Sequence, residues 1–151
     1  MRITIARFLI RYAEATRAAS AAPGAGARAL RWAEKLASHE PSVAIALAQR
    51  ERDGGSLREA EERITRSIAS NPGHSGLTIA LASIYSRTGR TRDALRILED
   101  ILANGSILNK NAQIDAQLEL SIVLGACGRT ADAALHAEAV LQQMPNDSEL
   151  R

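Results

Sequence analysis

The stretch LASIYSRTGRTRDA, residues 81–94, decides the fold, because its spacing of Leu81, Gly89 and Ala94 occurs three times in the chain. The same spacing, Leu-x7-Gly-x4-Ala, returns in LAQRERDGGSLREA (47–60) and in LSIVLGACGRTADA (120–133). Successive copies begin 34 and 39 residues apart. A period of 34 residues is typical of solenoids of helix–turn–helix units, each of which must stack on a neighbour to bury its apolar face. We assign the extra residues of the second interval to a loop around residues 105–109.

Composition favours closely packed helices. The chain has 151 residues, enough for one domain, and 46% of them are apolar while only 3% are aromatic. Alanine and aliphatic side chains must therefore form the core, and alanine both allows close approach and is the best helix former. The single Cys127 excludes an internal disulfide. The apolar runs near the N-terminus are too short for a signal-peptide core or a membrane span, so we expect a cytoplasmic protein.

Charge is balanced overall but unevenly distributed. The net charge of +2 does not by itself indicate nucleic-acid binding. Residues 1–40 are predominantly basic, whereas residues 114–151 are predominantly acidic. We interpret these charges as solvated outer faces, with steering of a partner as the alternative.

Apolar periodicity with proline and glycine breaks predicts eight helices, at 3–21, 27–39, 42–53, 57–70, 75–88, 91–104, 110–127 and 130–144. Ser56 followed by Glu59 predicts a capping box, and Thr91 and Thr130 are expected N-caps. Arg58, Glu62 and Arg66, and likewise Glu59 and Arg63, are expected to provide i, i+4 charges on a solvated face.

The repeated unit resembles the tetratricopeptide repeat. In that family the glycine marks the turn between helices A and B, the alanine lets them approach closely, and a proline such as Pro72 or Pro145 closes the unit. The resemblance implies an all-α, right-handed α-solenoid of stacked antiparallel helix pairs, forming a single domain over 1–151. Its repeats would be 41–74, 75–108 and 114–147, after a degenerate N-terminal pair or cap at 1–40. Residues 148–151 would begin a truncated or missing C-terminal cap.

The family's groove lies along the A helices. The resemblance implies a peptide-binding groove formed by Ile45, Gln49, Arg52, Ile79, Ser83, Arg87, Leu118 and Ile122. Ile45, Ile79 and Leu118 occupy equivalent positions, which suggests an apolar stripe for aliphatic anchors of a peptide. The alternative is that these aliphatics contact neighbouring helices and only border the groove. Arg52 and Arg87 could hold a carboxylate.

No catalytic, metal or cofactor motif is found, and the three histidines lie far apart in the sequence. We therefore expect a non-catalytic scaffold for protein–protein interaction, with a protein or peptide partner and no nucleic acid or membrane span. One alternative is an accessory or N-terminal domain of a larger enzyme or of a secretion or assembly component. Another is a self-associating structural protein, with a homo-oligomer formed through the uncapped C-terminal end.

Overall fold

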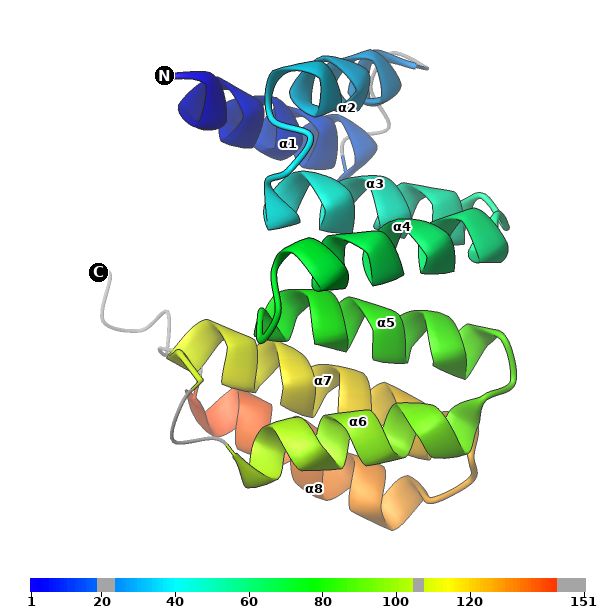
Figure 1. The fold of residues 1–151 in the computed structure, drawn as a ribbon. Helices are drawn as coiled ribbons and strands as arrows, with labels where there is room; N and C mark the ends of the chain where they lie inside the picture. Colours follow the sequence, from blue (N-terminus) through cyan, green and yellow to red (C-terminus); the bar gives the residue numbers. More distant parts are fainter. Residues whose placement is uncertain (19–23, 105–107, 144–151) are drawn as a thin grey trace, which may run out of the picture. The chain divides into compact units, whose positions relative to one another are not determined.

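The computed structural model describes residues 1–18, 24–104 and 108–143, and every regular element in these ranges is an α-helix (Figure 1). The eight helices of the described ranges agree closely with the predicted ones, except that the expected ends at 19–21 and 144 lie outside the described residues. The all-α class and the packing in sequential antiparallel pairs are thus confirmed. The helices are α1 (Arg2–Ala18), α2 (Ala25–Leu36), α3 (Pro41–Asp53), α4 (Leu57–Ser70), α5 (Ser75–Arg87), α6 (Thr91–Ala103), α7 (Lys110–Ala126) and α8 (Thr130–Gln143).

The chain forms two compact units, Met1–Ala80 and Leu81–Arg151, and the division falls inside α5. In the first unit α1 packs on α2, α3 packs on α4, and α3 also contacts α1 and α2. In the second unit α7 packs on both α6 and α8. None of the described helices is long and apolar enough to cross a membrane.

The three sequence repeats have the same turn between their helices. The glycine of each copy is left-handed, with φ of 85° at Gly55, 80° at Gly89 and 77° at Gly128. The N–H that follows each glycine donates to the carbonyl five residues earlier: Ser56 to Glu51 at 2.8 Å, Arg90 to Tyr85 at 2.9 Å and Arg129 to Leu124 at 3.0 Å. This bond closes a Schellman-type helix end, which needs a residue without a Cβ at the left-handed position. The repeated sequence therefore encodes a repeated local structure.

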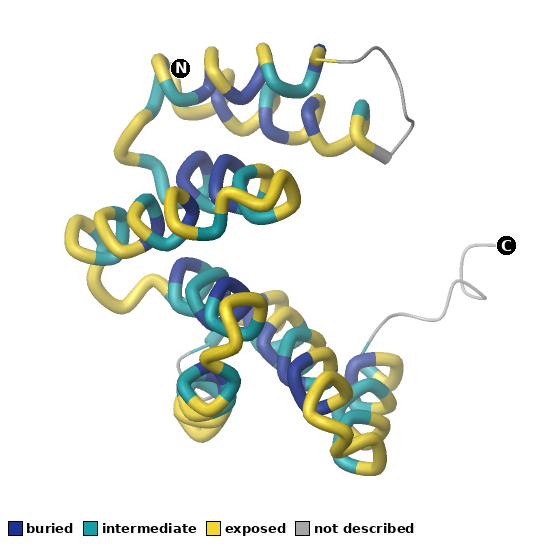
Figure 2. The backbone as a smooth tube through the Cα atoms, turned by 90° about the vertical axis from the view of Figure 1, so that its right-hand side faces the viewer, coloured by how far each residue is buried: buried dark blue, intermediate teal, exposed yellow. Residues whose placement is uncertain are grey.

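Small side chains let the helices of the first unit approach closely. Its main hydrophobic cluster consists mostly of alanines from α1, α2 and α3, with Ile10, Leu30, Val43 and Leu47. A Cβ added at Gly26 would lie 3.0 Å from the Thr16 hydroxyl and 3.2 Å from the Ala13 carbonyl, so α1 and α2 are in near-backbone contact. Figure 2 shows the buried residues of this pair and of α3 facing one another. The alanine-rich core expected from composition is present.

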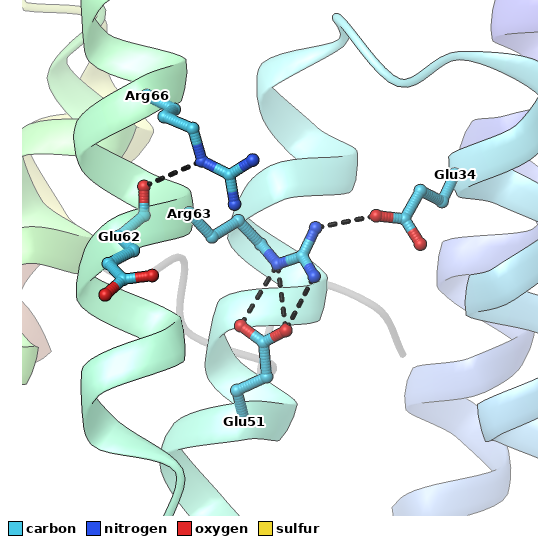
Figure 3. Close-up of polar contacts among 5 residues, drawn as sticks. All are labelled: Glu34, Glu51, Glu62, Arg63 and Arg66. Atoms are coloured by element: carbon cyan, nitrogen blue, oxygen red, sulfur yellow. Dashed lines mark hydrogen bonds and ion pairs between the residues drawn. The ribbon is translucent and has the colours of Figure 1, made fainter.

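A charged cluster joins three helices of the first unit (Figure 3). The Arg63 guanidinium on α4 donates to the Glu51 carboxylate on α3, with a shortest distance of 2.6 Å, and to Glu34 on α2 at 2.7 Å. The hydrogen bond to Glu51 is the main cause that raises the pKa of Arg63, against the opposing effect of burial. Of the i, i+4 charges expected on α4, Arg58 and Glu62 do pair on the exposed side, at 3.1 Å. The expected solvated arrangement of Arg63 with Glu59 is wrong, because Arg63 turns inward to the two carboxylates.

Helix starts differ in detail from the prediction. Ser56 precedes α4, but its side chain makes no capping hydrogen bond, so the expected capping box does not form. Thr91 and Thr130 are the first helical residues of α6 and α8 rather than caps. Asn109 is the side-chain cap found at α7, where its Oδ1 accepts from the Ala112 N–H at 2.8 Å. Ser, Thr, Asn and Asp all favour the position just before a helix, so sequence alone does not choose between neighbouring candidates. Assigned helix ends also vary by one or two residues.

Candidate functional site

The residues expected to line a groove come from α3, α5 and α7. Those of α3, together with Ile79 at the start of α5, belong to the first unit, whereas the others belong to the second. The expected groove residues are therefore divided between the two units. The residues of the second unit are Ser83, Arg87, Leu118 and Ile122.

On α3 the expected residues are largely engaged with neighbouring groups. Ile45 is half-buried, and its Cδ1 lies 3.2 Å from where a Cβ would stand on Gly76, so it packs at the start of α5. The Arg52 Nε donates to the Asp53 carboxylate at 3.2 Å, and the Arg52 side chain is mostly buried. This contact occupies one side of the guanidinium that was expected to hold a peptide carboxylate.

Gln49 is half-buried and lines an open pocket of about 220 Å³ between α1, α2 and α3. Its lining includes Arg17 and Asp53, whose guanidinium and carboxylate are 3.0 Å apart. Apolar walls come from Ala13, Leu30 and Ala46. The sequence did not predict this pocket, because it depends on how α1 and α2 sit on α3 rather than on the spacing within any one helix.

On α5 the expected residues differ in exposure. Ile79 is 8% exposed and Ser83 is 5% exposed, so both lie within the helix packing. Arg87, in the last turn of α5, is exposed. The equivalence of Ile45, Ile79 and Leu118 in sequence is thus accompanied by different degrees of burial.

On α7 the expected residues form an exposed aliphatic pair. Leu118 is 47% exposed and Ile122 is 55% exposed. They are four residues apart, so they lie one above the other on the same face of the helix. The opposite face is buried through Ala116, Leu120 and Val123. Helix α7 therefore packs into the unit on one side and presents two large aliphatic side chains to solvent on the other.

Asp115 continues this face one turn before Leu118. Burial raises the pKa of its carboxyl above the ordinary 3.8, although the residue as a whole is exposed. The two observations agree if the carboxylate lies against the helix surface while the rest of the residue faces water. We define the α7 face as Asp115, Leu118 and Ile122. It combines an acidic group in a partly desolvated position with two aliphatic side chains.

Helix α7 makes polar contacts at its start and in its middle. Asn109 caps its first turn, and in the middle of the helix the Gln143 side-chain amide of α8 donates to the Gln117 side-chain oxygen at 2.9 Å. The Ser121 hydroxyl donates to the Leu118 carbonyl at 2.8 Å, so it is turned back along the helix. The α7 face is thus carried by a regular helix, and sites on helices are positioned more precisely than sites on loops.

Comparison with known protein families and with curated proteins finds no match to this chain. Within the described ranges, no three side chains of His, Cys, Asp or Glu lie close enough together to hold a metal ion.

Proposed function

We propose that this chain is a non-catalytic scaffold of the tetratricopeptide-repeat type that binds a peptide or protein segment on the α7 face. The three turns with one left-handed glycine geometry support the assignment to that type of repeat. The exposure of Leu118 and Ile122 is the observation that carries the binding proposal. Large aliphatic side chains placed together on a surface characteristically mark an interaction site.

The spacing of the two aliphatic side chains defines the partner. Leu118 and Ile122 are four residues apart, which is about 6 Å along the helix axis. In an extended peptide, alternate side chains on the same side are about 6.6 Å apart. A segment with aliphatic residues at i and i+2 therefore matches the pair. A basic residue beside these anchors would face Asp115, whose partly desolvated carboxylate gains most from a cation.

The experiment selects binding peptides from a random-sequence library on the wild-type chain and measures each affinity by calorimetry. Burying the exposed halves of two aliphatic side chains contributes about 2 kcal/mol, or about thirtyfold in affinity. We expect the double variant Leu118→Glu/Ile122→Glu to bind the selected peptides at least about tenfold more weakly. The selected sequences should be enriched in aliphatic residues two positions apart.

Thr65→Glu provides the matched control, because Thr65 is an exposed residue of α4 in the first unit. It adds a negative charge without altering the α7 face, so binding should be unchanged. Circular dichroism checks that all variants keep their helices. Equal affinity of the selected peptides for the double variant and the wild type would exclude the α7 face as the binding site.

A further inference from the structure

Exposed large hydrophobic residues gather on the first and last helix pairs. Among the described residues, every exposed large hydrophobic side chain lies in 1–36 or in 110–143, and the helices between them have none. The α7 face accounts for two of these residues. The rest lie on α1, α2 and α8: Met1, Ile3, Ile5, Phe8, Tyr12, Trp32, Leu135 and Leu141.

Four large hydrophobic side chains at Met1 and along α1 form a narrow stripe, whereas the exposed Ile3 lies on another side of the helix. Met1, Ile5, Phe8 and Tyr12 are spaced by four, three and four residues, which puts them on one side of the helix. The buried Ala6, Ile10 and Ala13 occupy a different side, against the core of the unit. A stripe with this 4-3-4 spacing is the pattern of a seam against another helix, and it is narrower than the broad apolar face of a membrane-surface helix.

Trp32 extends the stripe onto α2. Gly26 lies against Ala13 and Thr16, and the two helices are antiparallel, so Trp32 comes to the level of Phe8 along the pair. Trp32 is 60% exposed and Phe8 65% exposed. Aromatic residues make up only 3% of the chain. Three of these few aromatic residues, Phe8, Tyr12 and Trp32, therefore lie on the surface of this helix pair rather than in its core. We define the first-pair face as Met1, Ile5, Phe8, Tyr12 and Trp32.

Cations predominate around the first-pair face. Arg2, Arg11, Arg28 and Arg31 are exposed and make no ion pair within the described residues, and the Lys35 ammonium lies 5.3 Å from the Trp32 ring. Of the acidic residues in 1–40, Glu34 and Glu40 are paired with Arg63 and Arg7, and Glu14 is exposed three residues after Arg11. A complementary partner is therefore a helix with aliphatic side chains beside an unpaired acidic group.

Helix α8 has that chemistry. Leu135 and Leu141 are 65% and 68% exposed, and Glu138 lies between them, three residues from each, so the three side chains cover about a third of the helix circumference. Glu138 is exposed and makes no ion pair within the described part of the chain. We define the α8 face as Leu135, Glu138 and Leu141. It is aliphatic and acidic, whereas the first-pair face is aromatic and lies among predominantly cationic side chains.

We propose that copies of this chain associate head to tail, with the first-pair face of one copy against the α8 face of the next. The aliphatic residues of α8 would cover the stripe of α1, and Glu138 would meet the cations around it. The contact uses two different surfaces, so it is heterologous and leaves one free face of each kind on every dimer. This inference is independent of peptide binding, because it does not use the α7 face.

The test uses two variants, Phe8→Glu in the first-pair face and Leu135→Glu in the α8 face. Both positions are exposed, so the helices should persist in each variant. Analytical ultracentrifugation of the wild type should show an average mass that rises with concentration up to about 100 μM, a range that detects weak interfaces. Each variant alone should associate at least about tenfold more weakly, because it places a charge in the apolar contact.

The mixture of the two variants distinguishes a heterologous contact from any other. Phe8→Glu keeps its α8 face and Leu135→Glu keeps its first-pair face, so an equimolar mixture should form a one-to-one dimer that does not grow further. Thr65→Glu should associate as the wild type does. A monomeric wild type at every concentration, a mixture no more associated than its components, or association unaffected by salt would each overturn the proposal.

Discussion

Replacement of Arg63 by Met should destabilise the first unit by about 1–3 kcal/mol. Arg63 is only 24% exposed and donates to Glu51 through both Nε and Nη2, at 3.0 and 2.6 Å. A partly buried, two-point bond of this kind contributes about 1–2 kcal/mol. The bond to Glu34 is more exposed and adds up to about 1 kcal/mol. Methionine keeps the apolar stem, so the loss isolates the guanidinium contacts.

The assay is urea unfolding followed by far-UV circular dichroism, with the slope of the transition compared between variants. Arg58→Met is the matched control on the same helix. Arg58 is 89% exposed and pairs only with Glu62 at i, i+4 among the described residues, a contact that contributes at most about 0.5 kcal/mol. In a double-mutant cycle, Arg63→Met and Glu51→Gln should be non-additive by at least about 1 kcal/mol. Equal losses for Arg63→Met and Arg58→Met would refute the assigned role of the cluster.

Three further predictions concern the repeat turns, the charge on α7 and the core. Gly128→Ala should destabilise by about 1 kcal/mol because φ is positive there, whereas Gly125→Ala, where a Cβ meets nothing closer than 4.0 Å, should stabilise slightly in thermal unfolding. Burial raises the pKa of Asp115, so the folded state holds its proton more tightly, and stability falls as pH rises from 3.8 through the folded pKa. Asp115→Asn should therefore be more stable than wild type at neutral pH, by a small margin because solvent screens this exposed residue. The difference should vanish in acid, where Asp115 is protonated in both states; a constant difference at all pH values would contradict this. Ile64→Ala should cost about 2–5 kcal/mol in urea unfolding because Ile64 is fully buried, and a loss below about 1 kcal/mol would show that the core closes over the cavity.

The helices and their turns could be predicted from the sequence because their causes are local. Glycines at fixed intervals mark the left-handed positions, and all three landmark glycines adopt that conformation. Of the alanine landmarks, Ala60 and Ala94 are fully buried and Ala133 is half-buried. Spacing of apolar residues and the positions of proline place the helix ends within a few residues.

The partners of Arg63 could not be predicted, because Glu34 lies 29 residues away in sequence and the contact depends on the packing of α2, α3 and α4. The burial of individual side chains could not be predicted from the alignment of the repeats either. Ile79 and Leu118 occupy equivalent positions, yet the first is buried and the second is exposed. An equivalent position fixes the side of the helix, whereas burial depends on what covers that side. The groove as a continuous surface over three helices therefore stays a prediction, and the α7 face is the part carried by exposed side chains.

Binding on the α7 face is tested most directly by methyl NMR of the chain with a selected peptide. The account predicts contacts from the peptide to the methyl groups of Leu118 and Ile122, seen as intermolecular Overhauser effects. The methyl signals of the buried Leu77 and Ile84 should show none. A bound peptide that contacts other methyl groups, such as those of Leu135, and leaves Leu118 and Ile122 unaffected would contradict the account.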